Sequence, residues 1–136
     1  MASSIDVACI SAANNTLDDV VPDPYGVTER TVSFEAATSV APEHAELCVA
    51  KLGDWFVVLD PGARLIDSRD YAREVSANGD AYLFRISDQP IAEHFRTGKP
   101  QPIPGGGTAS WGMMRELTGI TAEALQGATF TVLEMD

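Results

Sequence analysis

An apolar run in the first half of the chain constrains the fold most. Residues 55–59 read Trp-Phe-Val-Val-Leu, so side chains at both odd and even positions are apolar. Because successive side chains of a strand point to opposite faces of a sheet, this strand needs cover on both faces, or at least partial shielding of its outer face. A short Leu-Gly-Asp connection at 52–54 separates it from another strand-like run at 46–51. These features predict a β-hairpin whose second strand lies inside a sheet.

The remaining elements are predicted from periodicity and from capping residues. Strands are expected at 5–11, 31–37, 81–87 and 129–135, and helices at 68–77, 88–98, 109–118 and after Thr121. Residues 14–26 and 99–107 are rich in turn residues and are expected to be irregular. The order of elements predicts an α+β single domain over residues 1–136, with an antiparallel or mixed sheet of five to six strands. The short helices are expected mainly on one face of this sheet.

Length and cysteine content place bounds on the class of protein. The chain has 136 residues, 45% of them apolar, which suffices for one domain with its own core. The N-terminal residues lack the features of a secretory signal, and no apolar run approaches the roughly 18 residues that span a bilayer. We therefore expect a cytoplasmic protein that does not bind membranes. In that compartment Cys9 and Cys48 are expected to be buried, reduced thiols.

Charge is distributed unevenly along the sequence. Residues 1–50 contain eight acids and one base, whereas residues 51–100 contain eight acids and seven bases. An acidic surface attracts basic proteins and repels nucleic acid, which needs clustered Lys and Arg. We therefore predict a basic protein as the partner and no direct binding of nucleic acid. The predicted partner-binding residues are Asp18, Asp19, Asp23 and Glu29.

Signatures of catalysis and metal binding are weak. His44 and His94 each follow a glutamate, but adjacent side chains diverge on both helices and strands, so neither pair makes a ready acid–base dyad. Cys9 and Cys48 do not have the spacing of a zinc site. The Gly-x-Ser-x-Gly sequence of a serine nucleophile is also missing. We expect no metal, no cofactor and no catalytic residue, which favours a non-enzymatic function.

A glycine-rich loop provides the main alternative. Residues 102–108 read Pro-Ile-Pro-Gly-Gly-Gly-Thr and lead into a predicted helix, where backbone N–H groups can bind a phosphate or carboxylate. However, the nearby lysine precedes the glycines, unlike the lysine of a P-loop, and a simple surface connection has the same composition. The candidate anion-binding residues are Lys99, Gly105, Gly106, Gly107 and Thr108, with Trp55 and Trp111 as pocket residues.

The segment 53–62, Gly-Asp-Trp-Phe-Val-Val-Leu-Asp-Pro-Gly, followed by a helix and a strand, resembles a family of uncharacterised small actinobacterial proteins. Some of these look like immunity-type or accessory proteins. The resemblance covers residues 46–96 and implies neither an active site nor a cofactor.

Two hypotheses about function follow. The first is a non-enzymatic interaction protein whose acidic N-terminal region binds a basic protein. It includes an immunity protein, an inhibitor that mimics nucleic acid, and a subunit of a small complex. The alternative is a small-molecule or nucleotide-binding protein, including an enzyme, that uses the loop at 105–108. The sequence leaves open whether the chain forms a homodimer.

Overall fold

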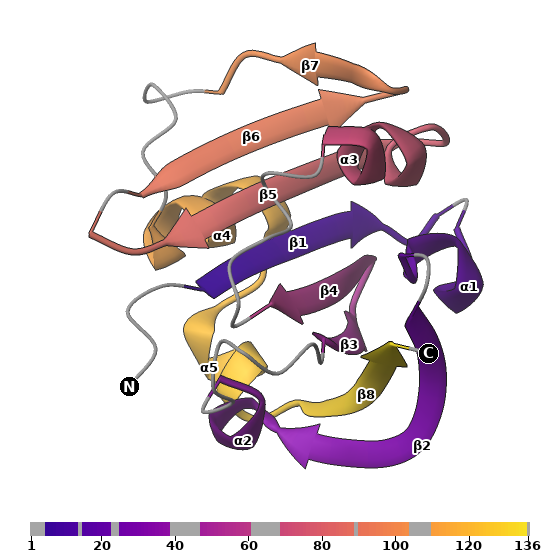
Figure 1. Ribbon diagram of the computed structural model, residues 1–136. Coiled ribbons are helices and arrows are strands. Elements are labelled where there is room, and N and C mark those ends of the chain that lie inside the picture. The colour runs from indigo at the N-terminus through magenta and orange to yellow at the C-terminus, as the bar shows by residue number, and fades with distance from the viewer. Residues whose placement is uncertain are drawn as a thin grey trace.

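The computed structural model describes residues 5–13, 15–22, 25–38, 47–60, 69–88, 90–103 and 110–135. Within these residues the chain forms one sheet flanked by short helices (Figure 1). The strands are β1 (Ile5–Ser11), β2 (Tyr25–Ser33), β3 (Leu47–Leu52), β4 (Trp55–Asp60), β5 (Asp80–Ile86), β6 (Ile91–Arg96), β7 (Lys99–Gln101) and β8 (Thr129–Met135). The helices are α1 (Leu17–Val20), α2 (Phe34–Thr38), α3 (Arg69–Val75), α4 (Trp111–Thr118) and α5 (Ala122–Gln126).

The sheet is larger than the sequence predicts. It contains eight strands in the order β2-β8-β3-β4-β1-β5-β6-β7, and neighbouring strands pair in antiparallel fashion. The predicted sheet of five to six strands is therefore wrong. The predicted hairpin is confirmed as β3 and β4, and β4 lies inside the sheet between β3 and β1.

Strands β6 and β7 account for much of this difference. Residues 88–98 were expected to be helical because Ile91 and Phe95 are one helical turn apart. In the structure Ile91–Arg96 pairs with β5 and turns through 97–98 into β7. Pairing with a buried neighbouring strand outweighs the local helical spacing, which is a weak signal over six residues. Strand β7 contains Pro100, which is tolerated because β7 is at the edge of the sheet.

The boundary between β2 and α2 also differs from the prediction. The expected strand at 31–37 is divided: β2 ends at Ser33, and α2 occupies Phe34–Thr38. The Ser33 hydroxyl accepts a hydrogen bond from the Ala36 backbone N–H at 3.1 Å, as a helix-capping side chain does. Alternating polarity over so few residues is compatible with either a strand or one turn of helix. The capping hydrogen bond of Ser33 favours the helix here.

Helices cover both faces of the sheet, which corrects the prediction that they lie mainly on one face. Figure 1 shows α3 in front of the sheet and α4 behind it. One buried cluster joins β1 and β4 to α1 and α3 and includes Ala8, Ile10, Val20, Val58, Tyr71, Val75 and Leu83. The other joins the opposite face to α2, α4 and α5 and includes Val7, Cys9, Ala37, Val57, Leu59, Phe84, Met114 and Leu125. Strands that are apolar on both faces require these two layers of cover.

Buried positions agree with the sequence in part. Within the apolar run at 55–59, Val57 and Leu59 are fully buried as predicted, whereas Trp55 is only half-buried. Cys9 and Cys48 are buried and form no disulfide. None of the helices among the described residues is long and apolar enough to cross a membrane.

Candidate functional site

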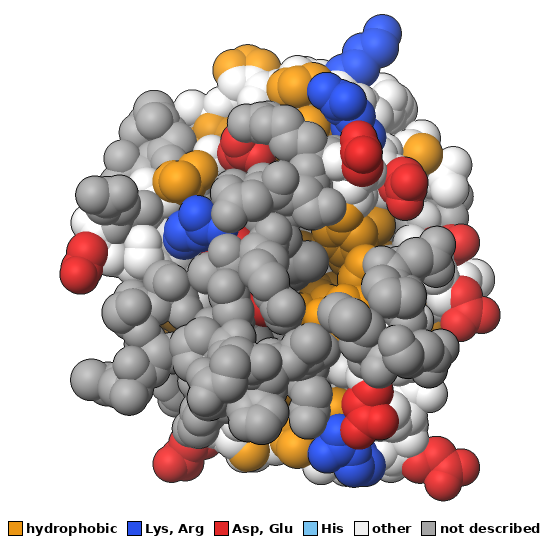
Figure 2. Space-filling model, in the orientation of Figure 1, with side chains coloured by type: hydrophobic (Ala, Val, Ile, Leu, Met, Phe, Trp, Pro, Cys, Tyr) orange, Lys and Arg blue, Asp and Glu red, His pale blue; other side chains and the backbone are white. Residues whose placement is uncertain are grey.

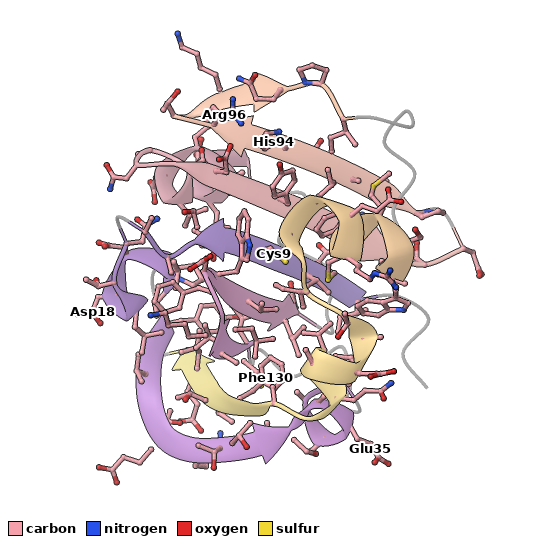
Figure 3. The ribbon with its side chains drawn as sticks, turned by 180° about the vertical axis from the view of Figure 1, so that it is seen from behind. Cys9, Asp18, Glu35, His94, Arg96 and Phe130 are labelled. Atoms are coloured by element: carbon pink, nitrogen blue, oxygen red, sulfur yellow. The ribbon has the colours of Figure 1, made fainter. Side chains whose placement is uncertain are left out.

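The order of the strands places exposed acids from the N-terminal part of the sequence along one edge of the sheet. Strand β2 forms one edge of the sheet, with α1 before it and α2 after it in the chain. Figure 3 shows Asp18 and Glu35 at opposite ends of the arc that β2 follows, and Arg96 far from both. Asp18, Asp19, Glu29 and Glu35 are all exposed along this side, and we call these four residues the acidic edge. Three exposed bases, Arg73, Arg96 and Lys99, lie on α3, β6 and β7, toward the other edge.

The four residues of the acidic edge have different local roles. Asp19 accepts hydrogen bonds from the Thr16 backbone N–H at 2.7 Å and from the Thr16 hydroxyl at 3.1 Å, so it caps α1. Asp18 and Glu29 form no ion pair among the described residues. Glu35 was not singled out from the sequence, and it joins the set because α2 follows β2 directly. The predicted residue Asp23 lies outside the described residues.

Strand β2 has features that discourage pairing with another strand. Its register against β8 shifts between Val27 and Thr31. The Arg30 guanidinium pairs with Glu134 of β8, and both side chains are exposed on this edge. Irregular register and charge are common protections of edge strands. Figure 2 shows the face that carries α1 and α3, with carboxylates spread around its rim.

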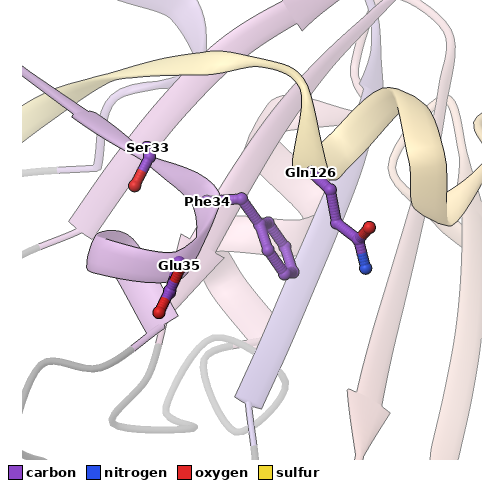
Figure 4. A pocket seen from close by; sticks show the side chains of 4 residues that line it. All are labelled: Ser33, Phe34, Glu35 and Gln126. Carbon is purple, nitrogen blue, oxygen red and sulfur yellow. The ribbon is translucent and has the colours of Figure 1, made fainter.

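A groove lies where the acidic edge ends, between α2 and α5. Figure 4 shows the Phe34 side chain extending from α2 toward Gln126 of α5. This hollow has a volume of about 410 Å³ and is lined by Ser33, Phe34, Glu35 and Gln126. An adjoining hollow of about 170 Å³ shares Phe34 and Gln126 and adds Trp111, Ala122 and Leu125. We call the two hollows together the α2–α5 groove.

Aromatic rings form one wall of the α2–α5 groove. The Phe34 ring meets Trp111 edge to face, with ring centres 6.3 Å apart and planes at 71°. The centre of the Phe34 ring also lies 6.2 Å from that of Phe130, which is fully buried. Phe34 and Trp111 are themselves only half-buried. The groove therefore presents apolar surface to solvent beside polar groups at its rim.

A second group of polar side chains joins β5 to β6. Asp80 Oδ1 lies 2.8 Å from Nε2 of His94 and accepts a hydrogen bond from Nε of Arg96, also at 2.8 Å. The His94 ring stacks on Tyr82, with centres 4.2 Å apart and planes at 17°. Partial burial acts to raise the pKa of Asp80, but the hydrogen bonds and charges of Arg96 and His94 outweigh it and lower that pKa. We call Asp80, Tyr82, His94 and Arg96 the β5–β6 cluster.

Tyr82 of the β5–β6 cluster and Cys9, which lies opposite it on β1, are unsuited to act as nucleophiles at neutral pH. Partial burial and the charge of Asp80 raise the pKa of the Tyr82 phenol, and complete burial raises the pKa of the Cys9 thiol. Both groups therefore stay protonated, whereas nucleophilic catalysis needs an activated group. Among the described residues, no three His, Cys, Asp or Glu side chains are placed to hold a metal ion. The geometry of the cluster is that of a cross-strand link between β5 and β6.

A buried ion pair joins β1 to β5 on the opposite face. The Arg85 guanidinium donates to Asp6 through Nε at 2.8 Å and through Nη2 at 3.1 Å. The Asp6 side chain is fully buried, and it lies opposite buried Asp60 on β4. Neither this pair nor the β5–β6 cluster was predicted, because both depend on which strands are neighbours. Once 91–96 is taken as a strand, its alternation does place His94 and Arg96 on one face.

The residues of the alternative site are only partly described. Gly105, Gly106, Gly107 and Thr108 lie outside the described residues. Lys99 is exposed on β7, where it lies opposite Arg96 in the strand register. Trp55 lines a hollow of about 320 Å³ between the β3–β4 turn and the α4–α5 connection. Trp111 instead lines the α2–α5 groove, so the two tryptophans belong to different hollows.

Comparison with protein-family models, with curated proteins and with solved structures finds no match. The resemblance seen over residues 46–96 therefore stays a prediction. Evidence on function comes from the geometry of this chain.

Proposed function

We propose that this chain is a non-enzymatic interaction protein that binds a basic protein along its acidic edge. One observation carries the proposal: the exposed acids of α1, β2 and α2 follow one edge of the sheet, where the exposed base Arg30 is already paired with Glu134, while the exposed bases of α3, β6 and β7 lie elsewhere. An immunity protein, an inhibitor that mimics nucleic acid and a subunit of a small complex all fit this description. What these roles share is recognition of a basic surface.

The charge of the acidic edge acts chiefly on the rate of association. The chain carries a formal net charge of −11, and acids gathered on one side orient an approaching basic protein. Such steering raises association rates by about 10- to 1,000-fold at low salt, and it is screened over about 10 Å at 0.1 M salt. Exposed acids contribute little to folding, so they can serve recognition at small cost in stability.

The chemistry of the interior supports a binding role over a catalytic one. The pKa values of the Tyr82 phenol and the Cys9 thiol are both raised, so, within the part of the chain that the structure describes, neither of these groups next to the Asp80–His94 pair is an activated nucleophile. A cytoplasmic location is part of the proposal, because both cysteines are buried and reduced.

Affinity capture from a lysate of the source organism tests the proposal with three forms of the protein. The edge variant combines Asp18→Asn, Glu29→Gln and Glu35→Gln, and it leaves Asp19 intact because Asp19 caps α1. The matched control combines Glu74→Gln, Asp88→Asn and Glu116→Gln, which are exposed acids elsewhere. Both variants change the net charge equally. We expect the wild type and the control to retain the same basic protein and the edge variant to lose it. Equal retention by all three forms would contradict the proposal.

A further inference from the structure

The α2–α5 groove has the composition of an anchor site for a protein partner. Its rings, Phe34 and Trp111, are held edge to face and are half-buried, so part of their surface still faces solvent. Such exposed aromatic surface is stabilised when another apolar group covers it. Such surfaces accept the few large side chains that contribute most of the binding energy of an interface.

The size of the α2–α5 groove limits what it can accept. Its adjoining hollows have volumes of about 410 and 170 Å³, and small-molecule sites usually occupy about 300–1,000 Å³. Phe34 and Gln126 line both hollows; the larger one adds the polar side chains of Ser33 and Glu35, and the smaller one adds Trp111, Ala122 and Leu125. The smaller hollow suits one large apolar side chain. The larger hollow suits the polar backbone of the same segment and the residues beside that side chain.

Charge around the α2–α5 groove favours a basic segment of a partner over a second copy of this chain. Glu35 lines it, and Glu123 is exposed three residues before Gln126, on the same side of α5. Arg115 is exposed one turn after Trp111 on α4, so among the described residues these positions carry two acids and one base. The groove also continues directly from the acidic edge, because Ser33 and Phe34 follow β2 in the chain. A second copy of this chain would bring the same acids, and like charges disfavour that contact.

We infer that the α2–α5 groove binds one large apolar side chain from a segment of the partner that carries Lys or Arg on both sides of it. This inference rests on the proposed function and adds the anchor of the interaction. The acidic edge attracts the partner, and the groove fixes its position.

Tryptophan fluorescence tests the inference directly. The chain has two tryptophans, so the variant Trp55→Phe leaves Trp111 as a reporter inside the groove. The probes are three synthetic peptides: Lys-Arg-Ala-Phe-Ala-Arg-Lys, the same peptide with Ala for Phe, and the same peptide with Glu for each Lys and Arg. We expect the first peptide to cause a saturable change in Trp111 fluorescence. The second peptide should bind about tenfold more weakly, and the third should not bind. Equal binding of the first two, or no binding of the first, would overturn the inference.

Substitution of Gln126 provides a matched pair of variants. Gln126 is exposed at the rim of the groove, so its replacement should leave the fold intact, which the unfolding midpoint checks. Gln126→Lys should lower the affinity for the first, basic peptide by about tenfold. The Gln126→Glu variant should bind that peptide at least as tightly as the wild type does. The same affinity in both variants would overturn the inference.

The outcomes also separate this inference from the proposed function. If the edge variant loses the captured basic protein while both Gln126 variants retain it equally, the anchor site is wrong and the proposed function stands. If sedimentation shows a dimer whose formation excludes the basic peptide, the groove belongs to a second copy and the inference is wrong. If no form of the protein captures a basic partner, the proposed function itself fails, whatever the peptides do.

Discussion

The two ends of the sheet use charge in different ways. Toward β5, β6 and β7, acids meet bases across strands: Asp6 pairs with Arg85, and Asp80 contacts both His94 and Arg96. Toward β2 one exposed pair, Arg30 with Glu134, also joins two strands, but Asp18 and Glu29 are exposed and form no ion pair among the described residues. Charges in the first group hold strands together, whereas those in the second contribute to the field around the protein.

This difference predicts how substitutions should behave. Removing one partner of a buried ion pair takes charge and hydrogen bonds away from a group in the interior, which is costly, while removing an exposed acid changes little. Loss of stability should therefore fall steeply from Arg85 through Asp80 to the acidic edge. Loss of partner binding should follow the reverse order.

The largest loss of stability is expected for Arg85→Ala. It would leave the carboxylate of Asp6 buried beside Asp60 and lower the free energy of unfolding by about 3–5 kcal/mol. Urea denaturation measures this change. Arg115→Ala removes an exposed arginine of α4 and should stay within about 0.5 kcal/mol. Similar losses in the two variants would show that the buried pair has no special role.

A smaller and pH-dependent loss is expected for Asp80→Asn. The pKa of Asp80 is below its ordinary value of 3.8, so the carboxylate stabilises the folded state above that pH. This contribution disappears as the pH falls through the lowered pKa. The wild type should therefore be more stable than the variant near neutral pH, and the difference should shrink at acidic pH. A difference that is constant with pH, measured by urea denaturation, would exclude the ionised form as its source.

The smallest losses are expected along the acidic edge. Asp18→Asn, Glu29→Gln and Glu35→Gln should each change the free energy of unfolding by less than about 0.5 kcal/mol. Asp19→Ala should cost up to about 1 kcal/mol, because Asp19 caps α1. Thermal unfolding of the four single variants ranks them. A larger loss at Glu29 than at Asp19 would assign the edge a role in folding.

Local features of the fold could be predicted from the sequence. The β3–β4 hairpin follows from two strand-like runs around Gly53, which has a φ of 60°. Helix α4 ends at Gly119 with a φ of 80°, and the Thr121 hydroxyl caps α5 by accepting from the Ala124 backbone N–H at 3.0 Å. In each case the residues that decide the structure are close together in the chain.

Features that depend on distant partners could not be predicted. Residues 91–96 have the spacing of a short helix, and only pairing with β5 makes them a strand. The Asp6–Arg85 pair joins residues 79 positions apart, and no local pattern indicates that they meet. For the candidate site, the sequence revealed the acidic residues but not the α2–α5 groove, because α2, α4 and α5 meet only in the folded chain.

The rate of association with the captured basic protein tests the central claim most directly. Stopped-flow measurements at low and at physiological salt would compare the wild type with the edge variant and with the control variant of equal charge. We predict that added salt strongly slows the association of the wild type and of the control with the partner. At low salt the edge variant should associate about tenfold more slowly than the wild type, and its association rate should depend less on salt. Equal rates and equal salt dependence for all three proteins would contradict the claim that the acidic edge recognises the partner.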